Sequence, residues 1–204
     1  ARDMISIRDY HRVGTNAVID KDNPTPVPIR EEYVLQSRGC PFTSLSADTI
    51  INTVHGMLPI GQIAAEYNEI GVFTYDRVEK KAKVATARNI IRTGVNKKLV
   101  RVTFDDGTHI DCTPDHEFLT FKWGNQFVDG TEWFSEAKDL KKGTHVRAIK
   151  FPRTGVNPYP LACWGQKSKA IHLMVAEWKF QRSFSDGEKV HHIDRNKLNW
   201  HPDN

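Results

Sequence analysis

The stretch Arg38-Gly39-Cys40-Pro41-Phe42-Thr43-Ser44-Leu45-Ser46-Ala47-Asp48-Thr49 separates two parts of the chain that differ in character. Before it lies a polar segment with prolines at positions 24, 26 and 28, and this spacing excludes regular helix. After it, short apolar runs separated by turn residues continue to residue 152. Residues 1–43 are too few to form a core of their own. We therefore divide the chain first between Thr43 and Ser44.

The composition allows a cytoplasmic protein with an ordinary core. The chain has 204 residues, of which 39% are hydrophobic and 26% charged, enough for one large or two small domains. The net charge of +4 permits nucleic-acid binding without predicting it. No apolar run approaches the ~20 residues of a membrane span, no signal peptide is visible, and three cysteines do not make a disulfide framework. Because the chain begins with Ala1 and stops at Asn204, we expect a truncated fragment or half of a split element.

Residues 44–152 carry the signals of an all-β unit. Residues 99–104 and 108–112 alternate between apolar and polar side chains around Asp106-Gly107, which predicts a hairpin with a type I′ turn. A second hairpin is predicted around His55-Gly56, and Cys112 is expected to be a small buried strand residue. Repeated short strands favour an all-β unit over a βαβ arrangement.

Other elements are predicted on both sides of this unit. Residues 32–37 indicate a short strand and residues 62–67 a short helix. Residues 151–158 have the composition of a linker. Beyond them, the apolar residues of 171–178 recur at helical spacing. Residues 190–194 are predicted to form a short strand that carries His191 and His192.

Three side chains supply what cleavage of the chain's own peptide bond would need. The hydroxyl of Ser44 can attack the preceding carbonyl and replace the amide by an ester. His116 can protonate the departing nitrogen because its pKa lies near neutrality. Thr113 can polarise the carbonyl. These groups belong to one chain and act at high effective concentration.

The segments that hold these residues resemble those of an intein of the Hint superfamily. The resemblance covers the first block, the second block and the end of the N-terminal splicing region, in that order: 44–49, 113–119 and 133–149. It implies a horseshoe-shaped, mainly β domain over residues 44–152. Ser44 would be the first nucleophile, His116 the proton donor and Thr113 the residue that distorts or polarises the Thr43–Ser44 bond, with no cofactor. Asp48 and Thr49 would support the site.

The resemblance has two departures. The first residue is Ser, where Cys is commoner, and the terminal His-Asn block is absent. Ser44 could therefore be a slower natural nucleophile or an engineered change. Complete splicing would require the flanking extein segments and a complementary C-terminal intein fragment as partners.

The segment before the junction resembles the start of the cluster loop in radical S-adenosylmethionine enzymes, over the residues 38–43. Cys40 would be the first ligand of a [4Fe–4S] cluster in the spliced host. The second ligand would fall at position 44 and would come from the residue after the insert.

Residues 190–204 resemble the motif of HNH homing endonucleases, which cut double-stranded DNA with one divalent metal ion, here Mg²⁺ by expectation. The resemblance implies that His192 is the general base, His191 a metal ligand and Asn204 the residue that braces the loop. A third element, ~9 residues beyond Asn204 in the family, lies outside the sequence, and one ligand cannot hold a catalytic divalent ion. We therefore expect no nuclease activity from this chain.

Together these observations predict a mainly β Hint splicing domain with a small, incomplete α+β HNH module. The expected divisions are a host segment over 1–43, a splicing domain over 44–152 and a nuclease module over 153–204. One alternative is a free-standing HNH endonuclease whose β-rich region binds DNA, which predicts no cleavage at Ser44. Another is an inactive intein relic that persists as a stable β domain.

Overall fold

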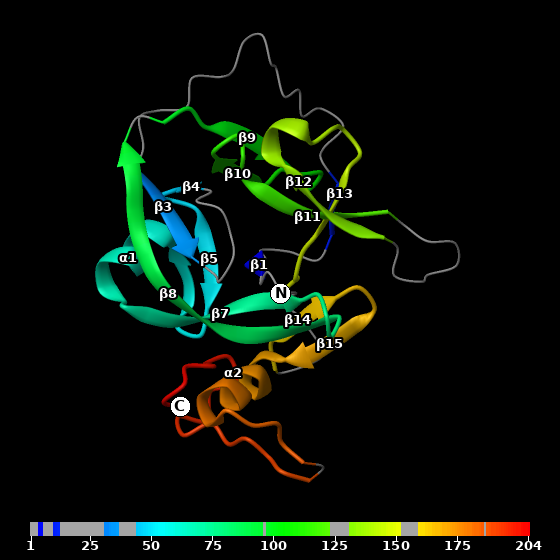
Figure 1. Cartoon of the computed structure of the whole chain (residues 1–204). Coiled ribbons are helices and arrows are strands. Elements are labelled where there is room, and N and C mark those ends of the chain that lie inside the picture. The colour runs from blue at the N-terminus through cyan, green and yellow to red at the C-terminus, as the bar shows by residue number, and fades with distance from the viewer. Residues whose placement is uncertain are drawn as a thin grey trace.

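Strands predominate in the part of the chain that the structure describes. The computed structural model describes residues 4–5, 10–12, 31–36, 44–95, 97–122, 131–151, 159–185 and 187–204. The mainly β class expected from the sequence is confirmed (Figure 1). The elements in chain order are β1 (Met4–Ile5), β2 (Tyr10–Arg12), β3 (Glu31–Gln36), β4 (Leu45–Ser46), β5 (Ile50–Thr53), β6 (Gly56–Pro59), α1 (Ile60–Glu66), β7 (Glu69–Asp76), β8 (Lys81–Val95), β9 (Val100–Thr103), β10 (His109–Cys112), β11 (Glu117–Phe121), β12 (Glu132–Glu136), η1 (Ala137–Asp139), β13 (His145–Arg147), β14 (Leu161–Trp164), β15 (Lys167–Ala170) and α2 (Ile171–Phe180).

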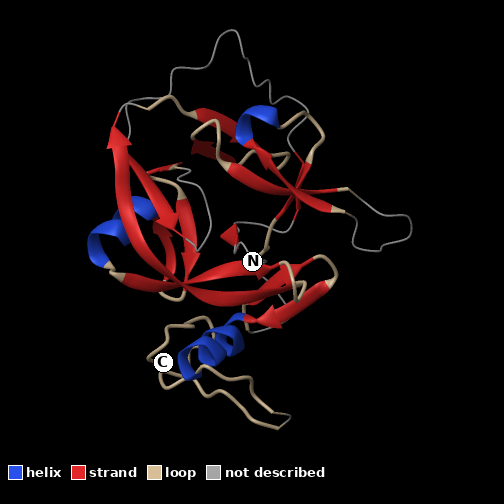
Figure 2. Ribbon diagram, in the orientation of Figure 1, coloured by secondary structure: helices blue, strands red, loops and turns tan. Residues whose placement is uncertain are grey.

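The strands form three sheets, which Figure 2 shows in red. The largest has the order β6-β5-β7-β8-β3-β4-β10-β9, with β1 beside β7. A second sheet has the order β12-β11-β13-β2, and β14 pairs with β15 in a hairpin. The predicted strand at residues 32–37 is confirmed as β3. Strands β1, β2 and β3 all precede Ser44, so the segment before the junction contributes strands to both larger sheets.

Strand β8 serves two partners in succession. Its first half pairs with β7 from Lys81 to Arg88, and its second half pairs with β3 from Arg88 to Val95. Asn89 lies at the change of partner with a φ of 54°, in the left-handed region that Asn tolerates better than most residues. The buried residues Ala87 and Ile90 are three apart across this point, so the strand shifts phase there, as at a β-bulge.

Both predicted hairpins and the first predicted helix are present. Strands β5 and β6 pair from Ile50 to Pro59, and α1 begins directly after β6. Strands β9 and β10 pair as expected, and Cys112 is fully buried, as predicted.

The predicted type I′ turn between β9 and β10 is wrong. That turn needs a positive φ at both central residues, whereas here Gly107 has a φ of 81° and Asp106 is not in the left-handed region. Gly107 donates its N–H to the Phe104 carbonyl at 3.0 Å, and the Asp106 carboxylate accepts the N–H of Thr108 at 2.9 Å. The loop is therefore one residue longer than the sequence suggested, because the Asp106 side chain caps it.

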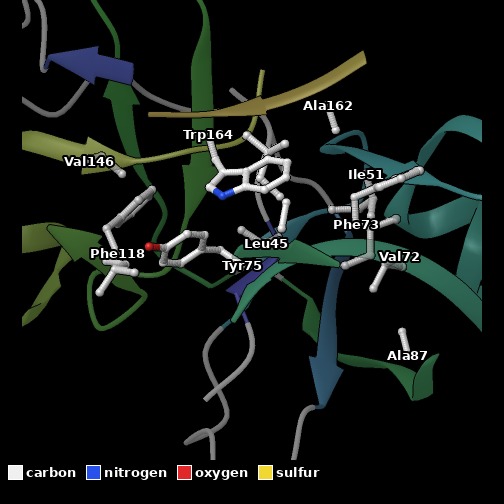
Figure 3. Close-up of a cluster of buried hydrophobic side chains, with 14 of the residues drawn as sticks. Leu45, Ile51, Val72, Phe73, Tyr75, Ala87, Phe118, Val146, Ala162 and Trp164 are labelled. Carbon is white, nitrogen blue, oxygen red and sulfur yellow. The ribbon is translucent and has the colours of Figure 1, made fainter. Parts of the chain in front are cut away.

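One hydrophobic cluster runs through the molecule. Figure 3 shows Tyr75 and Trp164 between Phe118 on one side and Phe73 on the other. Tyr75 and Phe73 are each 1% exposed and both lie on β7. The apolar positions of β7 thus supply the centre of the core.

Helix α2 belongs to the same cluster through the residues Ile171, Met174 and Val175, which confirms the helical spacing predicted for 171–178. The indole of Trp178 donates to the Thr86 hydroxyl at 2.9 Å. Gly71 on β7 makes this docking possible, because a Cβ there would lie 3.1 Å from the Trp178 ring. Among the described residues, no helix has the length and apolar character needed to cross a membrane.

The bend at Asn89 leads to a prediction about stability. We expect Asn89→Val to lower the free energy of unfolding by about 1–2 kcal/mol, because a β-branched residue is strained at positive φ. Asn89→Gly should leave stability within about 0.5 kcal/mol of the parent, since glycine adopts this conformation freely. Urea unfolding of the two variants measures the difference, and equal stabilities would contradict the bend.

Candidate functional site around Ser44

Ser44 and Thr113 are joined by two hydrogen bonds. Strand β4 follows Ser44 and pairs with β10, with Leu45 opposite Cys112, so the residue before one strand meets the residue after the other. The Thr113 N–H donates to the Ser44 carbonyl at 3.0 Å, and the Ser44 N–H donates to the Thr113 hydroxyl at 3.1 Å. Ser44 is fully buried and Thr113 is 5% exposed. The nitrogen of the Thr43–Ser44 peptide bond is therefore held by the Thr113 side chain.

The hydroxyl of Ser44 contacts two residues from the end of β8. It lies 2.9 Å from the hydroxyl of Thr93 and 3.4 Å from the amine of Lys97. Sequence reasoning missed both residues, which lie 49 and 53 positions away from Ser44. No local pattern marks them, because the pairing of β8 with β3 and β4 alone brings them here.

His116 lies on a turn that begins at Thr113. Its N–H donates to the Thr113 carbonyl at 3.0 Å, and its own carbonyl accepts the Ala137 N–H at 2.7 Å. The ring contacts Phe118 edge-on, with centroids 5.1 Å apart. Among the residues that the structure describes, its buried Nδ1 has no hydrogen-bond partner.

Burial lowers the pKa of His116 to about 4, and the nearby Asp115 only partly opposes this effect. The imidazole is therefore neutral near pH 7, with one N–H to donate and one lone pair to accept. The turn brings His116, Thr113 and Ser44 together in sequence register, as the spacing predicted. Their catalytic roles stay predictions.

The residues after Ser44 form a capped turn. The Ser46 hydroxyl donates to the Asp48 carboxylate, and the Thr49 N–H donates to the Ser46 carbonyl at 2.9 Å. Asp48 and Thr49 thus shape the segment beside the site, in line with the supporting role expected of them. Burial raises the pKa of the Cys112 thiol, so this neighbour of Thr113 stays an uncharged core residue.

The predicted strand at 190–194 is wrong. Residues 187–204 contain no strand, and turns replace it. The Asp194 carboxylate accepts the N–H of Asn196 at 2.7 Å and the side-chain amide of Asn199 at 2.7 Å. Such side-chain bonds to nearby groups compete with strand pairing, and they explain why the apolar pattern misled.

His191 and His192 lie apart in environment. His191 is exposed, whereas His192 is 7% exposed and its Nε2 is buried without a partner among the described residues. The His192 ring stacks with Tyr159 and tilts against His172, with centroids 5.8 Å and 5.0 Å away. A pocket of about 340 Å³ adjoins both histidines and is also lined by Lys179, Lys189 and Trp200.

Asn204 ties this segment together. Its side-chain oxygen accepts the Asp194 N–H at 2.9 Å, its amide donates to the Asn199 carbonyl at 2.8 Å, and its main-chain carbonyl accepts the Ile193 N–H at 3.0 Å. These bonds hold the loop that follows His192, which is the contact that the sequence predicted for Asn204.

The side chains present do not fit the expected divalent metal ion. Within the described ranges, no group of three or more His, Cys, Asp or Glu side chains is placed to hold one. His191, the predicted ligand, is exposed on its loop. We therefore derive no chemical step through a metal. Cys40, the predicted cluster ligand, lies outside the described residues, as does most of the linker over 151–158.

The C-terminal segment also contacts the β5–β6 hairpin. Nδ1 of His55 lies 2.8 Å from Nε2 of His201, and the His55 ring stacks on Tyr67. The indole of Trp200 donates to the Thr53 carbonyl at 3.4 Å. The segment that holds His192 is therefore anchored to the sheet that holds Ser44.

Comparison with known proteins gives a partial match. No protein-family model matches the chain. Over 136 residues, 60% of its length, the chain is 32% identical to the DNA gyrase B protein of Synechocystis sp. (strain ATCC 27184 / PCC 6803 / Kazusa). The chain spans 11% of the length of that relative. The class that the fold defines is a mainly β protein, and the match shows a shared segment, not a shared whole.

The lowered pKa of His116 predicts a pH dependence of stability. The folded-state pKa of about 4 lies below the ordinary value of 6.5, so the unfolded chain takes up the proton first as the pH falls. The stabilisation is complete above pH 6.5 and is lost on the way down to pH 4. The full difference corresponds to about 3 kcal/mol.

Urea unfolding between pH 7 and pH 4 measures this loss, in a Ser44→Ala background that prevents cleavage. We expect His116→Gln to flatten the pH dependence, and His109→Gln, at an exposed site on β10, to leave it unchanged. The same slope in all three chains would show that His116 titrates normally.

Proposed function

We propose that this chain holds the N-terminal part of a Hint-type protein-splicing element, which starts splicing by an N–O acyl shift at Ser44. The observation that carries the proposal is the pair of hydrogen bonds between Ser44 and Thr113. A turn serine with no chemical role would not need a buried amide nitrogen bonded to a distant hydroxyl. The neutral His116 on the adjoining turn supplies the remaining group.

The proposed shift exchanges one bond for another. The Ser44 oxygen bonds to the carbonyl carbon of Thr43, and the bond between that carbon and the Ser44 nitrogen breaks. The hydroxyl loses a proton and the nitrogen gains one, so the products are an ester and a free amine with no net change in protons. Thr113 orients the nitrogen by accepting its N–H. His116 provides a proton for the departing amine, because a neutral imidazole carries an N–H to donate.

The partial match supports an inserted unit. A segment that corresponds to 11% of a long protein behaves as a portable piece rather than as the equivalent of the whole. Gyrase activity is therefore not carried over to this chain. The radical S-adenosylmethionine-like host rests on residues 38–43 alone, which lie outside the described residues, and stays a sequence-based proposal.

The acyl shift is testable by intact mass spectrometry of the purified chain with and without hydroxylamine, which cleaves an ester at Thr43. We expect a fragment that ends at Thr43 in the parent and none in Ser44→Ala. His116→Ala should reduce the fragment by about 10²-fold or more, the usual contribution of a positioned acid. His109→Ala is the matched control and should cleave like the parent.

Two further outcomes decide among the alternatives. An uncleaved parent with a Ser44→Cys variant that yields a thioester would mean that serine is an inactivating residue at this position. No cleavage in either chain would favour the inactive relic or the free-standing nuclease.

We propose as a second function that residues 159–204 belong to a DNA-binding module of the HNH type. Two observations favour it: Asn204 braces the loop after His192, and the pocket beside His192 is lined by Lys179 and Lys189. DNA contact there would be electrostatic and would weaken with salt. The divalent metal ion and strand cutting remain expectations for a chain that holds further ligands.

DNA binding is measurable by fluorescence anisotropy with a mixed-sequence duplex across a salt series. We expect Lys189→Gln to weaken binding and to reduce the slope of log K against log salt by roughly 1, as for one lost phosphate contact. Lys142→Gln, at an exposed turn before β13, is the control. If Lys142→Gln has the larger effect, the β-rich region binds the DNA, as the free-standing nuclease alternative requires.

A further inference from the structure

We propose that Lys97 is a catalytic residue of the acyl shift, and that Thr93 orients the attacking hydroxyl; this inference rests on the proposed function. Both side chains contact the oxygen that would react. The Thr93 hydroxyl lies 2.9 Å from the Ser44 oxygen and the Lys97 amine 3.4 Å from it. They come from the second half of β8 and the segment after it, apart from the Thr113–His116 turn.

Gly94 provides a slot for the lysine. A Cβ at position 94 would lie 2.8 Å from Cε of Lys97 and 3.6 Å from its Cδ and Cγ. The aliphatic stem of Lys97 therefore lies along the bare backbone of Gly94. Although Lys97 as a whole is exposed, this support directs its amine to the fully buried Ser44.

The two contacts divide the hydrogen-bonding capacity of the Ser44 oxygen. A lysine ammonium only donates, whereas a serine hydroxyl donates once and accepts twice. Lys97 therefore takes one lone pair, the Ser44 proton points to Thr93, and the second lone pair is free to attack the carbonyl.

The same arrangement stabilises the charge that develops on oxygen. As the oxygen loses its proton and bonds to the carbonyl carbon, the ammonium donates to it without gaining or losing a proton itself. The proton lost from the hydroxyl balances the proton gained by the nitrogen. Serine needs such help more than cysteine, because a thiol ionises near pH 8.5 and an alcohol does not.

The test compares the rate of hydroxylamine-trapped cleavage in the full chain and its variants. Lys97→Met keeps the length of the stem and removes the charge, and we expect it to slow cleavage about 10-fold or more, near the low end for removal of a charged donor. Lys97→Arg should retain much of the rate. Lys98→Met, at the adjacent exposed position, is the control and should match the parent.

A second comparison separates activation of the oxygen from a structural role. In a Ser44→Cys background, Lys97→Met should slow thioester formation less than 3-fold, because the thiolate forms without the ammonium. An equal loss in the serine and cysteine backgrounds would mean that Lys97 only supports the fold and would overturn the proposal.

Gly94→Ala tests the slot. It should displace the lysine stem and slow the serine reaction, and the Gly94→Ala/Lys97→Met chain should be no slower than Lys97→Met alone, since both act through one interaction. Multiplied effects would contradict the slot. If the parent cleaves and Lys97→Met cleaves equally fast, this inference fails and the proposed function stands; if neither the parent nor Ser44→Cys cleaves, both fail.

Discussion

The bend of β8 at Asn89 is the constraint on which the rest of the structure depends. A straight strand of this length would continue beside β7 and leave β3 without its partner. Because the strand changes direction, its first half carries the core beside β7 and its second half reaches the site. A single backbone conformation thus connects the packing of Tyr75 to the surroundings of Ser44.

The candidate site joins three segments that are far apart in the chain. Pairing of β4 with β10 brings Ser44 to Thr113, the turn after Thr113 adds His116, and the end of β8 adds the lysine and threonine. Each segment contacts a different atom of Ser44 or its turn, so the nitrogen and the oxygen have separate partners. This separation suits a reaction in which one atom must accept a proton while the other loses one.

Much of the β architecture could be predicted from the sequence because alternating runs and turn residues act locally. The hairpins at His55-Gly56 and Gly107 and the helix at 171–178 follow such rules. Predictions failed where a side chain replaced a backbone partner: Asp106 lengthened one turn, and the Asp194 contacts removed the expected strand. Ser44, Thr113 and His116 could be found from chain order and resemblance. Thr93 and Lys97 could not, because only strand pairing places them.

The docking of α2 has a consequence for the modularity of the gene. Its apolar face is continuous with the core of the β-rich region, and the Trp178 ring covers Gly71 on β7. A deletion that shortened the protein to its first 152 residues would uncover the outer side of β7 and β8. The polypeptide can therefore be divided at the linker in its sequence but not in its solvent boundary, and a minimal version would need a new polar surface over these strands.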